Sequence, residues 1–391
     1  MKPYIIDAET NIKNRGEGSI GTMQASPYHP DNKIVLFGEG KQVGKEFDVA
    51  TFKSDQVPYF LYHAKTAPVL LVGHNITFDL KYVAKTWPEH WKAVIGNIYI
   101  WDTQQVAYLL SGQTHMYPSL DQLCAEIGHV LKDEKIRAYW DAGVDTEMIP
   151  ADELEDYLRH DIRATAAVFR FQYEVVRALP NLFNLIRVKS DDMLMTSLME
   201  SNGMFFDIAL ANTISSDLSL EIKEFEEDLL LAASANNWPV EKAGPFNPLS
   251  PEHVSLLLFG GPITYKEDVV QIGPDGNPIV YKTGAKKGLP KTKKQEKTFD
   301  YDGIGLVPIG EPNKKGIYST SEEVLDELKH PVADAILELR ALYKDVETYY
   351  KGYSKLVWPD GLIHPNINHC STRTGRQSCT QPNLQNASKG D

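Results

Sequence analysis

The chain has 391 residues and a formal net charge of −13, because 53 acidic residues outnumber 40 lysines and arginines. This length predicts two or three domains, and a hydrophobic content of 42% is typical of a globular protein that buries sizeable cores. The sequence has no apolar run of membrane-spanning length and no basic-then-apolar leader, which predicts a cytoplasmic protein with no membrane partner. Its three cysteines, Cys124, Cys370 and Cys379, lack the spacing of a metal knuckle or a disulfide framework.

Strand patterns alternate with helical patterns up to about residue 180. The predicted strands are rich in β-branched and aromatic residues and cover residues 4–10, 33–40, 69–75 and 98–103. Apolar residues at helical spacing predict helices over 78–87 and 152–179. This alternation predicts an α/β domain with a mixed sheet.

The first predicted strand ends in two acidic residues, Asp7 and Glu9. Because successive side chains of a strand alternate between faces, both carboxylates point to the same side. Like charges at that separation repel one another unless a cation, a proton or bulk water relieves them. Two interpretations follow: a strand that runs into a solvated acidic turn, or one half of a cation site.

Two later segments carry acidic residues that could complete such a site. Asp79 stands at the start of the helix that follows strand 69–75, and strand-to-helix junctions of α/β sheets gather functional groups. Tyr157 precedes Asp161 by four residues, so the two side chains project from the same face of a helix. Taken singly, Asp79 and Asp161 are better explained as capping or surface acids.

The order and spacing of these five residues resemble the DEDD exonucleases, which include ribonuclease D and the proofreading 3′–5′ exonuclease domains of family A DNA polymerases. Histidine-type relatives place a histidine where Asp156 stands here, whereas Tyr157 matches the tyrosine type. The resemblance implies a ribonuclease H-like α/β exonuclease domain over residues 1–180, with a mixed sheet flanked by helices. It also matches Thr10 and Asn75 to positions near the terminal nucleotide, although a turn-forming role explains Asn75 nearly as well.

By this resemblance the site holds two divalent cations, Mg²⁺ or Mn²⁺, for in-line hydrolysis of a phosphodiester. Asp7, Glu9 and Asp161 would hold the cation beside the attacking water, and Asp7 would bridge to the second cation. Asp79 would support the second cation through water. Tyr157, together with Glu9, would orient the attacking water.

The next part of the chain, residues 181–358, has a mostly helical pattern. Its segments 246–260 and 316–353 resemble the thumb of family A polymerases and flank a Pro/Gly/Lys-rich insertion at 262–316. A basic stretch in an acidic protein indicates a grip on the DNA backbone, with a solvated loop or a docking loop for a processivity factor as alternatives. The lysines assigned to DNA contact are Lys286, Lys287, Lys291, Lys293 and Lys294.

Residues 371–386 resemble the first palm motif of family A polymerases, usually T-G-R-x-S-x-x-x-P-N-L-Q-N. The resemblance implies that Arg376 contacts the minor groove near the primer end. It also implies that Gln385 and Asn386 lie beside the primer–template duplex. Only five residues follow Asn386, so the segment 359–391 is expected to be an incomplete start of the palm.

The leading hypothesis is a metal-dependent 3′–5′ exonuclease that proofreads primer ends as the N-terminal half of a phage-like split family A polymerase. Palm and fingers would come from another chain, polymerisation would need both chains, and the location would be the host cytoplasm if the gene is phage-encoded. A free-standing exonuclease and a DNA-binding structural subunit of a polymerase complex are the alternatives. The complete set of carboxylates argues against a purely structural role, and a polymerase-like reading frame directly downstream would argue against the free-standing enzyme.

Overall fold

The computed structural model of the chain describes residues 1–13, 25–43, 46–129 and 135–386. The chain forms two compact units: Met1–Phe206 together with Lys355–Asp391, and Asp207–Ser354. The helix Pro180–Asn202 and the C-terminal segment therefore both belong to the first unit, while the predicted roles of segments 1–180, 181–358 and 359–391 remain predictions. In the described ranges, no helix is both long enough and apolar enough to cross a membrane.

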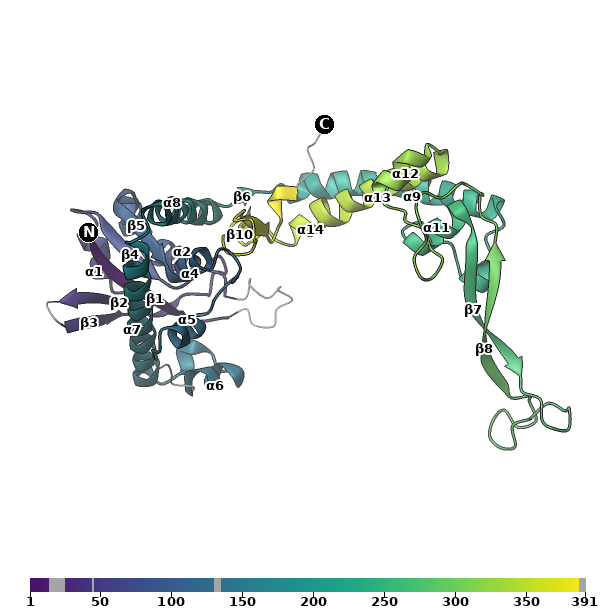
Figure 1. Ribbon diagram of the computed structural model, residues 1–391, viewed down its shortest axis with the longest axis horizontal. Coiled ribbons are helices and arrows are strands. Elements are labelled where there is room, and N and C mark those ends of the chain that lie inside the picture. Colours follow the sequence, from purple (N-terminus) through teal and green to yellow (C-terminus); the bar gives the residue numbers. More distant parts are fainter. Residues whose placement is uncertain (14–24, 44–45, 130–134, 387–391) are drawn as a thin grey trace. The chain divides into compact units, whose positions relative to one another are not determined.

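The first unit is built on a mixed five-stranded sheet in the order β3-β2-β1-β4-β5 (Figure 1). β1 pairs with β2 and β2 with β3 in antiparallel fashion, whereas β1 with β4 and β4 with β5 are parallel. This confirms the predicted mixed sheet, although β3 was not predicted. The strands are β1 (Lys2–Thr10), β2 (Ile34–Val43), β3 (Glu46–Phe52), β4 (Val69–Gly73) and β5 (Ile98–Asp102).

Helices cover both faces of this sheet. The long helix α7 crosses β1 and β2 on one face (Figure 1), where Leu158 and Ile162 pack with Ile5 of β1. On the other face, Ile6 packs with Leu80 of α2. Because side chains alternate along β1, Asp7 and Glu9 follow Ile5 onto the face that α7 covers. The helices of this unit are α1 (Tyr59–His63), α2 (Ile76–Thr86), α3 (Pro88–Val94), α4 (Thr103–Leu110), α5 (Leu120–Glu126), α6 (Lys135–Asp141), α7 (Ala151–Val176) and α8 (Pro180–Asn202), with 3₁₀ turns η2 (Ile95–Asn97) and η3 (Thr146–Met148).

The C-terminal segment of the first unit adds two small sheets beside α8. β6 (Met204–Phe205) pairs with β9 (Leu362–Ile363). β10 (Asn366–Asn368) pairs with β11 (Ser378–Thr380), and a 3₁₀ turn, η5 (Leu384–Asn386), follows.

The second unit confirms the predicted helical region. Its core joins the helices α9, α11, α12 and α13 through buried side chains such as Leu229, Leu257, Leu325 and Ile336. A π-helical segment, η4, continues α13 directly. The elements are α9 (Ile208–Ala235), α10 (Val240–Ala243), α11 (Pro251–Phe259), α12 (Glu322–Leu328), α13 (Pro331–Lys344), η4 (Asp345–Tyr350) and α14 (Lys351–Ser354).

A long antiparallel hairpin occupies much of the predicted insertion, residues 262–316, for which no strands were predicted. β7 (Gly261–Val270) and β8 (Thr292–Tyr301) pair over their full lengths and extend as an arm from the helices of this unit (Figure 1). Apolar residues alternate with polar ones only near the base of the hairpin, at Ile263, Tyr265, Phe299 and Tyr301, and most of the other side chains are exposed, so the pattern of a half-buried strand is short.

Candidate functional site

Three carboxylates predicted to share a site meet where α7 crosses β1. Asp7, Glu9 and Asp161 each offer a carboxylate oxygen, and these oxygens lie within 4.8 Å of one another. Glu9 is buried, so the alternative of a strand running out into a solvated turn is wrong. The strand continues to Thr10 and contains a register shift between Glu9 and Thr10.

The electrostatics of this group are unfavourable without a cation. Burial raises the pKa of Asp7 to about 7, and the Asp161 carboxylate adds to the rise. The pKa of Glu9 also lies well above its usual range, first because of burial and then because of Asp7 and Asp161. Removing a carboxylate from water disfavours its charge, and a neighbouring negative charge does the same. A divalent cation would reverse both effects, and hard oxygen donors are the ligands that Mg²⁺ and Mn²⁺ prefer.

Asp79 is close to this group but is not part of its tight cluster. It lies in the first turn of α2 and is buried. Burial is the main cause of its raised pKa, and the charges of Asp7, Asp102 and Glu9 add to it. Asp79 is therefore electrostatically coupled to the same charges, which suits a carboxylate on the far side of a shared cation pair.

Tyr157 lies one helical turn before Asp161 on α7, as its spacing predicted. A hydrogen bond joins its side chain to that of Asp161, and burial followed by the nearby carboxylates raises its pKa far above the usual range. The hydroxyl therefore stays protonated and acts as a hydrogen-bond donor. Trp140 packs edge-on against the tyrosine ring, with 5.6 Å between ring centroids.

Two glycines of β2 allow α7 to approach β1 this closely. Gly38 pairs with Asp7 across the antiparallel ladder. A Cβ atom at Gly38 would lie 2.2 Å from Cδ1 of Ile162, and one at Gly40 would lie 2.6 Å from Cγ2 of the same residue. Only the absence of side chains at these positions therefore permits the observed packing of the helix that carries Tyr157 and Asp161.

The sequence reading missed Asp102, a buried carboxylate at the end of β5. Its pKa is raised by burial, while the charge of His74 and hydrogen bonds from backbone N–H groups counteract the rise. Residues 98–103 were recognised as a strand, and an aspartate before a threonine at its end is a helix N-cap signal that could have drawn attention to this residue.

The two residues matched to the terminal nucleotide lie next to the elements that carry the carboxylates. Thr10 follows Glu9 on β1, and its side chain shares a hydrogen bond with Tyr82. Asn75 precedes α2 with a left-handed backbone (φ 56°). It lines a cavity of about 400 Å³ together with Lys81, Tyr117 and other residues of the first unit.

The predicted DNA-binding lysines belong to the second unit, on or near the hairpin arm. Lys286 and Lys287 are exposed in the turn region between β7 and β8. Lys291 lies just before β8, with its ammonium 5.5 Å from the ring centroid of Tyr281. Lys293 and Lys294 point to opposite faces of β8, and Lys294 stands across from Asp268, which offsets its charge.

The predicted palm residues lie in the C-terminal segment of the first unit. Arg376 is exposed, and its carbonyl accepts a hydrogen bond from Oγ1 of Thr372 (2.8 Å). Gln385 and Asn386 are exposed in η5, and Nε2 of Gln385 donates to the carbonyl of Gln377 (3.2 Å).

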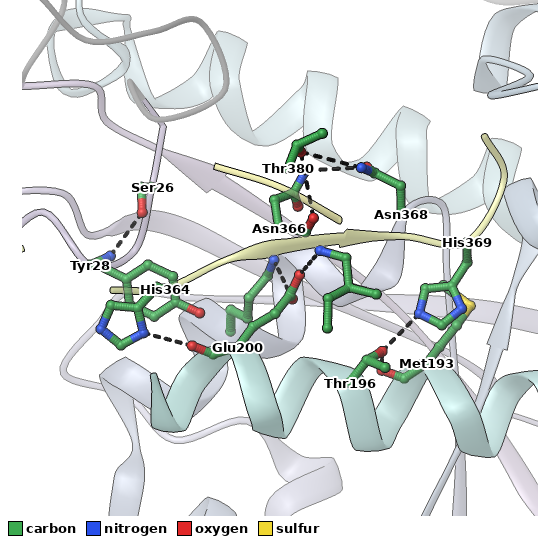
Figure 2. A network of polar contacts seen from close by, with 12 residues as sticks. Ser26, Tyr28, Met193, Thr196, Glu200, His364, Asn366, Asn368, His369 and Thr380 are labelled. Atoms are coloured by element: carbon green, nitrogen blue, oxygen red, sulfur yellow. Dashed lines mark hydrogen bonds and ion pairs between the residues drawn. The ribbon is translucent and has the colours of Figure 1, made fainter. Parts of the chain in front are cut away.

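This segment is fastened to α8 by the network in Figure 2. Both oxygens of Glu200 are engaged, one by the backbone N–H of Ile367 and the other by Nζ of Lys81 at 3.0 Å. Nδ1 of His364 donates to the carbonyl of Glu200 (2.6 Å), and the Tyr28 ring stacks on His364 at 3.6 Å between centroids. Since Lys81 is on α2, Glu200 links the helix that carries Asp79 to β10.

Known protein sequences resemble large parts of the chain. Residues 282–390 match the family model described as DNA polymerase family A. DNA polymerase I of Bacillus subtilis (strain 168) is 27% identical over 292 residues, which make up 73% of this chain and 26% of that protein. The thermostable DNA polymerase I of Thermus filiformis is 40% identical over 191 residues, 48% of this chain and 17% of that protein. The chain thus spans about a quarter or less of the length of these relatives.

A solved structure resembles the fold. The POL domain of Pol1 from M. smegmatis, in complex with a DNA primer-template and dNTP, matches with a TM-score of 0.58 and 16% sequence identity. The match covers 98% of this chain and 52% of that chain. At this identity the similarity concerns the fold, which resembles that of a family A polymerase POL domain.

Proposed function

Because the chain is related by sequence to family A DNA polymerases, we propose that it acts on DNA and that its first unit is a 3′–5′ proofreading exonuclease. The observation that carries the proposal is the cluster of Asp7, Glu9 and Asp161, with Tyr157 hydrogen-bonded to Asp161. Three carboxylates this close together, with Glu9 buried, cost stability unless cations or protons offset their charge.

In this proposal Asp7, Glu9 and Asp161 would hold one divalent cation, and Asp7 would also hold the second, which Asp79 would support through water. The two cations, when bound, lower the pKa of the attacking water and stabilise the leaving 3′ oxygen. That water would donate hydrogen bonds to Glu9 and to the Tyr157 oxygen, whose own hydrogen is donated to Asp161, so that a lone pair of the water is left to face the phosphorus. Tyr157 positions the water and does not remove its proton, because burial and the carboxylates keep the phenol protonated.

We assign the remaining parts by their resemblance to polymerase segments. The second unit serves as a thumb, and the lysines at the turn of its hairpin arm contact the DNA backbone, with a processivity factor as the alternative partner. Arg376, Gln385 and Asn386 lie beside the primer–template duplex. Nucleotide polymerisation would require palm and fingers, which we propose a second chain supplies.

The exonuclease proposal is tested with the purified chain and a single-stranded oligonucleotide labelled at its 5′ end. We expect a ladder of products shortened from the 3′ end, release of nucleoside 5′-monophosphates, and loss of both in EDTA. The double variant Asp7→Ala/Glu9→Ala should be inactive. Asp156→Asn is the matched control, because this exposed acid is adjacent to Tyr157 but faces away from the cluster. Binding of the oligonucleotide without hydrolysis would favour a structural DNA-binding subunit instead.

The dependence on a second chain is tested by primer extension. The chain alone should extend no primer, and extension should appear when a chain with palm and fingers is added and elutes together with it. Extension by the isolated chain would contradict this part of the proposal. Hydrolysis without any complementing chain in the source genome would favour a free-standing exonuclease.

A further inference from the structure

Asp102 uses one carboxylate to hold the starts of two helices. It is the N-cap of α4, and its Oδ1 accepts hydrogen bonds from the backbone N–H groups of Gln104 (2.8 Å) and Gln105 (3.1 Å). The same oxygen lies 3.3 Å from the backbone N of Asn75, and Oδ2 accepts from the N–H of Ile76 at 2.9 Å. An ordinary N-cap serves only its own helix, so the contacts to Asn75 and Ile76 are additional.

These additional contacts replace a cap that α2 lacks. Asn75 stands at the N-cap position of α2 but makes no side-chain cap hydrogen bond, and its backbone is left-handed. The first N–H groups of a helix need acceptors, and a left-handed non-glycine residue needs surroundings that hold it. Asp102 accepts hydrogen bonds from the N–H groups of Asn75 and Ile76 and so also holds the left-handed Asn75 in place. Both residues lie within about one helical turn before Asp79.

The residues that Asp102 holds present two amide side chains to the same cavity. Asn75, which precedes α2, and Gln104 of α4 both line the cavity of about 400 Å³, together with Lys81 and Tyr117. Nε2 of Gln104 donates to the carbonyl of Pro118 at 3.2 Å. Amide groups offer both donors and acceptors to base edges and phosphates, and aromatic rings and lysines add stacking and charge.

We propose that Asp102 is a positioning residue that holds Asn75 and Gln104 as a pair of substrate-facing amides, and that Gln104 contacts the 3′ strand of single-stranded DNA. This inference rests on the proposed exonuclease function, because it assigns the cavity to the same substrate. Asp102 itself is buried at 1% exposure and touches no substrate. Its effect reaches the DNA only through the two backbone segments that it holds.

A buried carboxylate elsewhere in the sheet provides the matched control for a purely structural role. Glu39 is also buried at 1% exposure, and its carboxylate accepts a hydrogen bond from the backbone N–H of Phe60 (2.8 Å) at the start of α1. Replacing either acid by its amide removes a charged acceptor for backbone N–H groups at the start of a helix. Only the change at Asp102 should also alter the binding of DNA.

The experiment measures binding of a fluorescent oligonucleotide of about ten deoxythymidines by anisotropy, with Ca²⁺ in place of Mg²⁺. We expect Asp102→Asn to raise the dissociation constant about tenfold at a temperature where the variant is folded, and Glu39→Gln to leave it unchanged. Gln104→Ala should raise it severalfold with only a small fall in melting temperature, since it loses one hydrogen bond, to Pro118, and this keeps the inference testable if Asp102→Asn fails to fold. Unchanged binding by Gln104→Ala, or equal effects of Asp102→Asn and Glu39→Gln, would overturn the inference.

This test separates the inference from the proposed exonuclease function. If the wild-type chain binds the oligonucleotide but never hydrolyses it in Mg²⁺, the exonuclease proposal fails while the roles of Asp102 and Gln104 in binding are still measured. If hydrolysis occurs and the Gln104→Ala variant binds and cleaves with wild-type constants, the exonuclease proposal stands and the inference fails.

Discussion

Replacement of Gly38 by alanine should damage the carboxylate site from a distance. The added Cβ would lie 2.2 Å from Cδ1 of Ile162 and 3.1 Å from Cγ of Leu158, whereas ordinary contact begins at 3.4 Å. Rotation of Ile162 about its Cβ–Cγ1 bond can move Cδ1, but Cγ and Cδ2 of Leu158 lie 3.1 and 3.2 Å from the added Cβ and leave it little room. We therefore expect α7 to shift away from β2 by up to about 1 Å and to carry Tyr157 with it.

Two magnitudes follow from that displacement. Overpacking of this kind costs about 1–3 kcal/mol of the free energy of unfolding. A misplacement of about 1 Å between catalytic groups costs on the order of 100-fold in rate, so hydrolysis of the 3′ end should fall far more than stability. Affinity for Mn²⁺ should fall as well, because Asp161 moves away from Asp7 and Glu9.

The assay combines thermal unfolding, Mn²⁺ titration and single-turnover hydrolysis. Gly96→Ala is the matched control, since a Cβ there meets no atom within 4 Å. The double variant Gly38→Ala/Ile162→Val removes the clashing Cδ1 and should recover most of the metal affinity. Wild-type Mn²⁺ affinity in Gly38→Ala, or no recovery in the double variant, would refute the reasoning.

Four further predictions concern the same site and the hairpin arm. Asp161→Ala should abolish metal-dependent removal of 3′ nucleotides, measured by release of mononucleotides, because a direct cation ligand is lost. Tyr157→Phe should slow single-turnover hydrolysis about 10- to 1,000-fold while the Mn²⁺ titration stays unchanged, because the hydroxyl only positions water. Because the pKa of Asp7 is about 7, protons compete with the cation below that pH, and the rise in melting temperature caused by Mg²⁺ should grow as pH increases towards 8 or so. Without metal, stability changes with pH in the opposite direction. Between pH 3.8 and about 7 the Asp7 carboxyl stays protonated in the folded state but loses its proton in the unfolded chain, so its contribution to the free energy of unfolding falls as the pH rises. Lys287→Ala should lower the salt dependence of duplex DNA binding by about one unit of slope, and Lys294→Ala by less, because Asp268 stands opposite Lys294 in the ladder.

The carboxylate site was predictable because its signals are local. Asp7 and Glu9 share a strand face, and Tyr157 and Asp161 share a helix face, so two periodicities bring each pair together without knowledge of the fold. What the sequence could not provide is the distance between the pairs. That distance depends on Gly38 and Gly40, and their role appears only when α7 is seen against β2.

The hairpin arm was not predictable from the same rules. Its strands form a ladder of ten residue pairs, and Glu267 makes an ion pair with Lys297. Away from the base of the hairpin most facing residues are charged or polar, such as Lys266 opposite Glu296, and a lysine-rich composition with little apolar alternation is also typical of a solvated loop. β3, an edge strand that pairs with β2, was also not predicted.

The role of Asp102 could be predicted only in part from the sequence. The end of β5 reads as an ordinary helix cap, and the cap is present. Its second task, holding Ile76 at the start of α2, depends on β4 and β5 lying side by side in the parallel part of the sheet. A contact between residues 26 positions apart has no periodicity to reveal it.

We propose that the cluster of Asp7, Glu9 and Asp161 is a metal centre. Anomalous diffraction from crystals soaked in millimolar Mn²⁺ tests this proposal most directly. We predict one peak in contact with Asp7, Glu9 and Asp161, and a second between Asp7 and Asp79. A map with no peak at these carboxylates, from crystals in which their side chains are well ordered, would contradict the account.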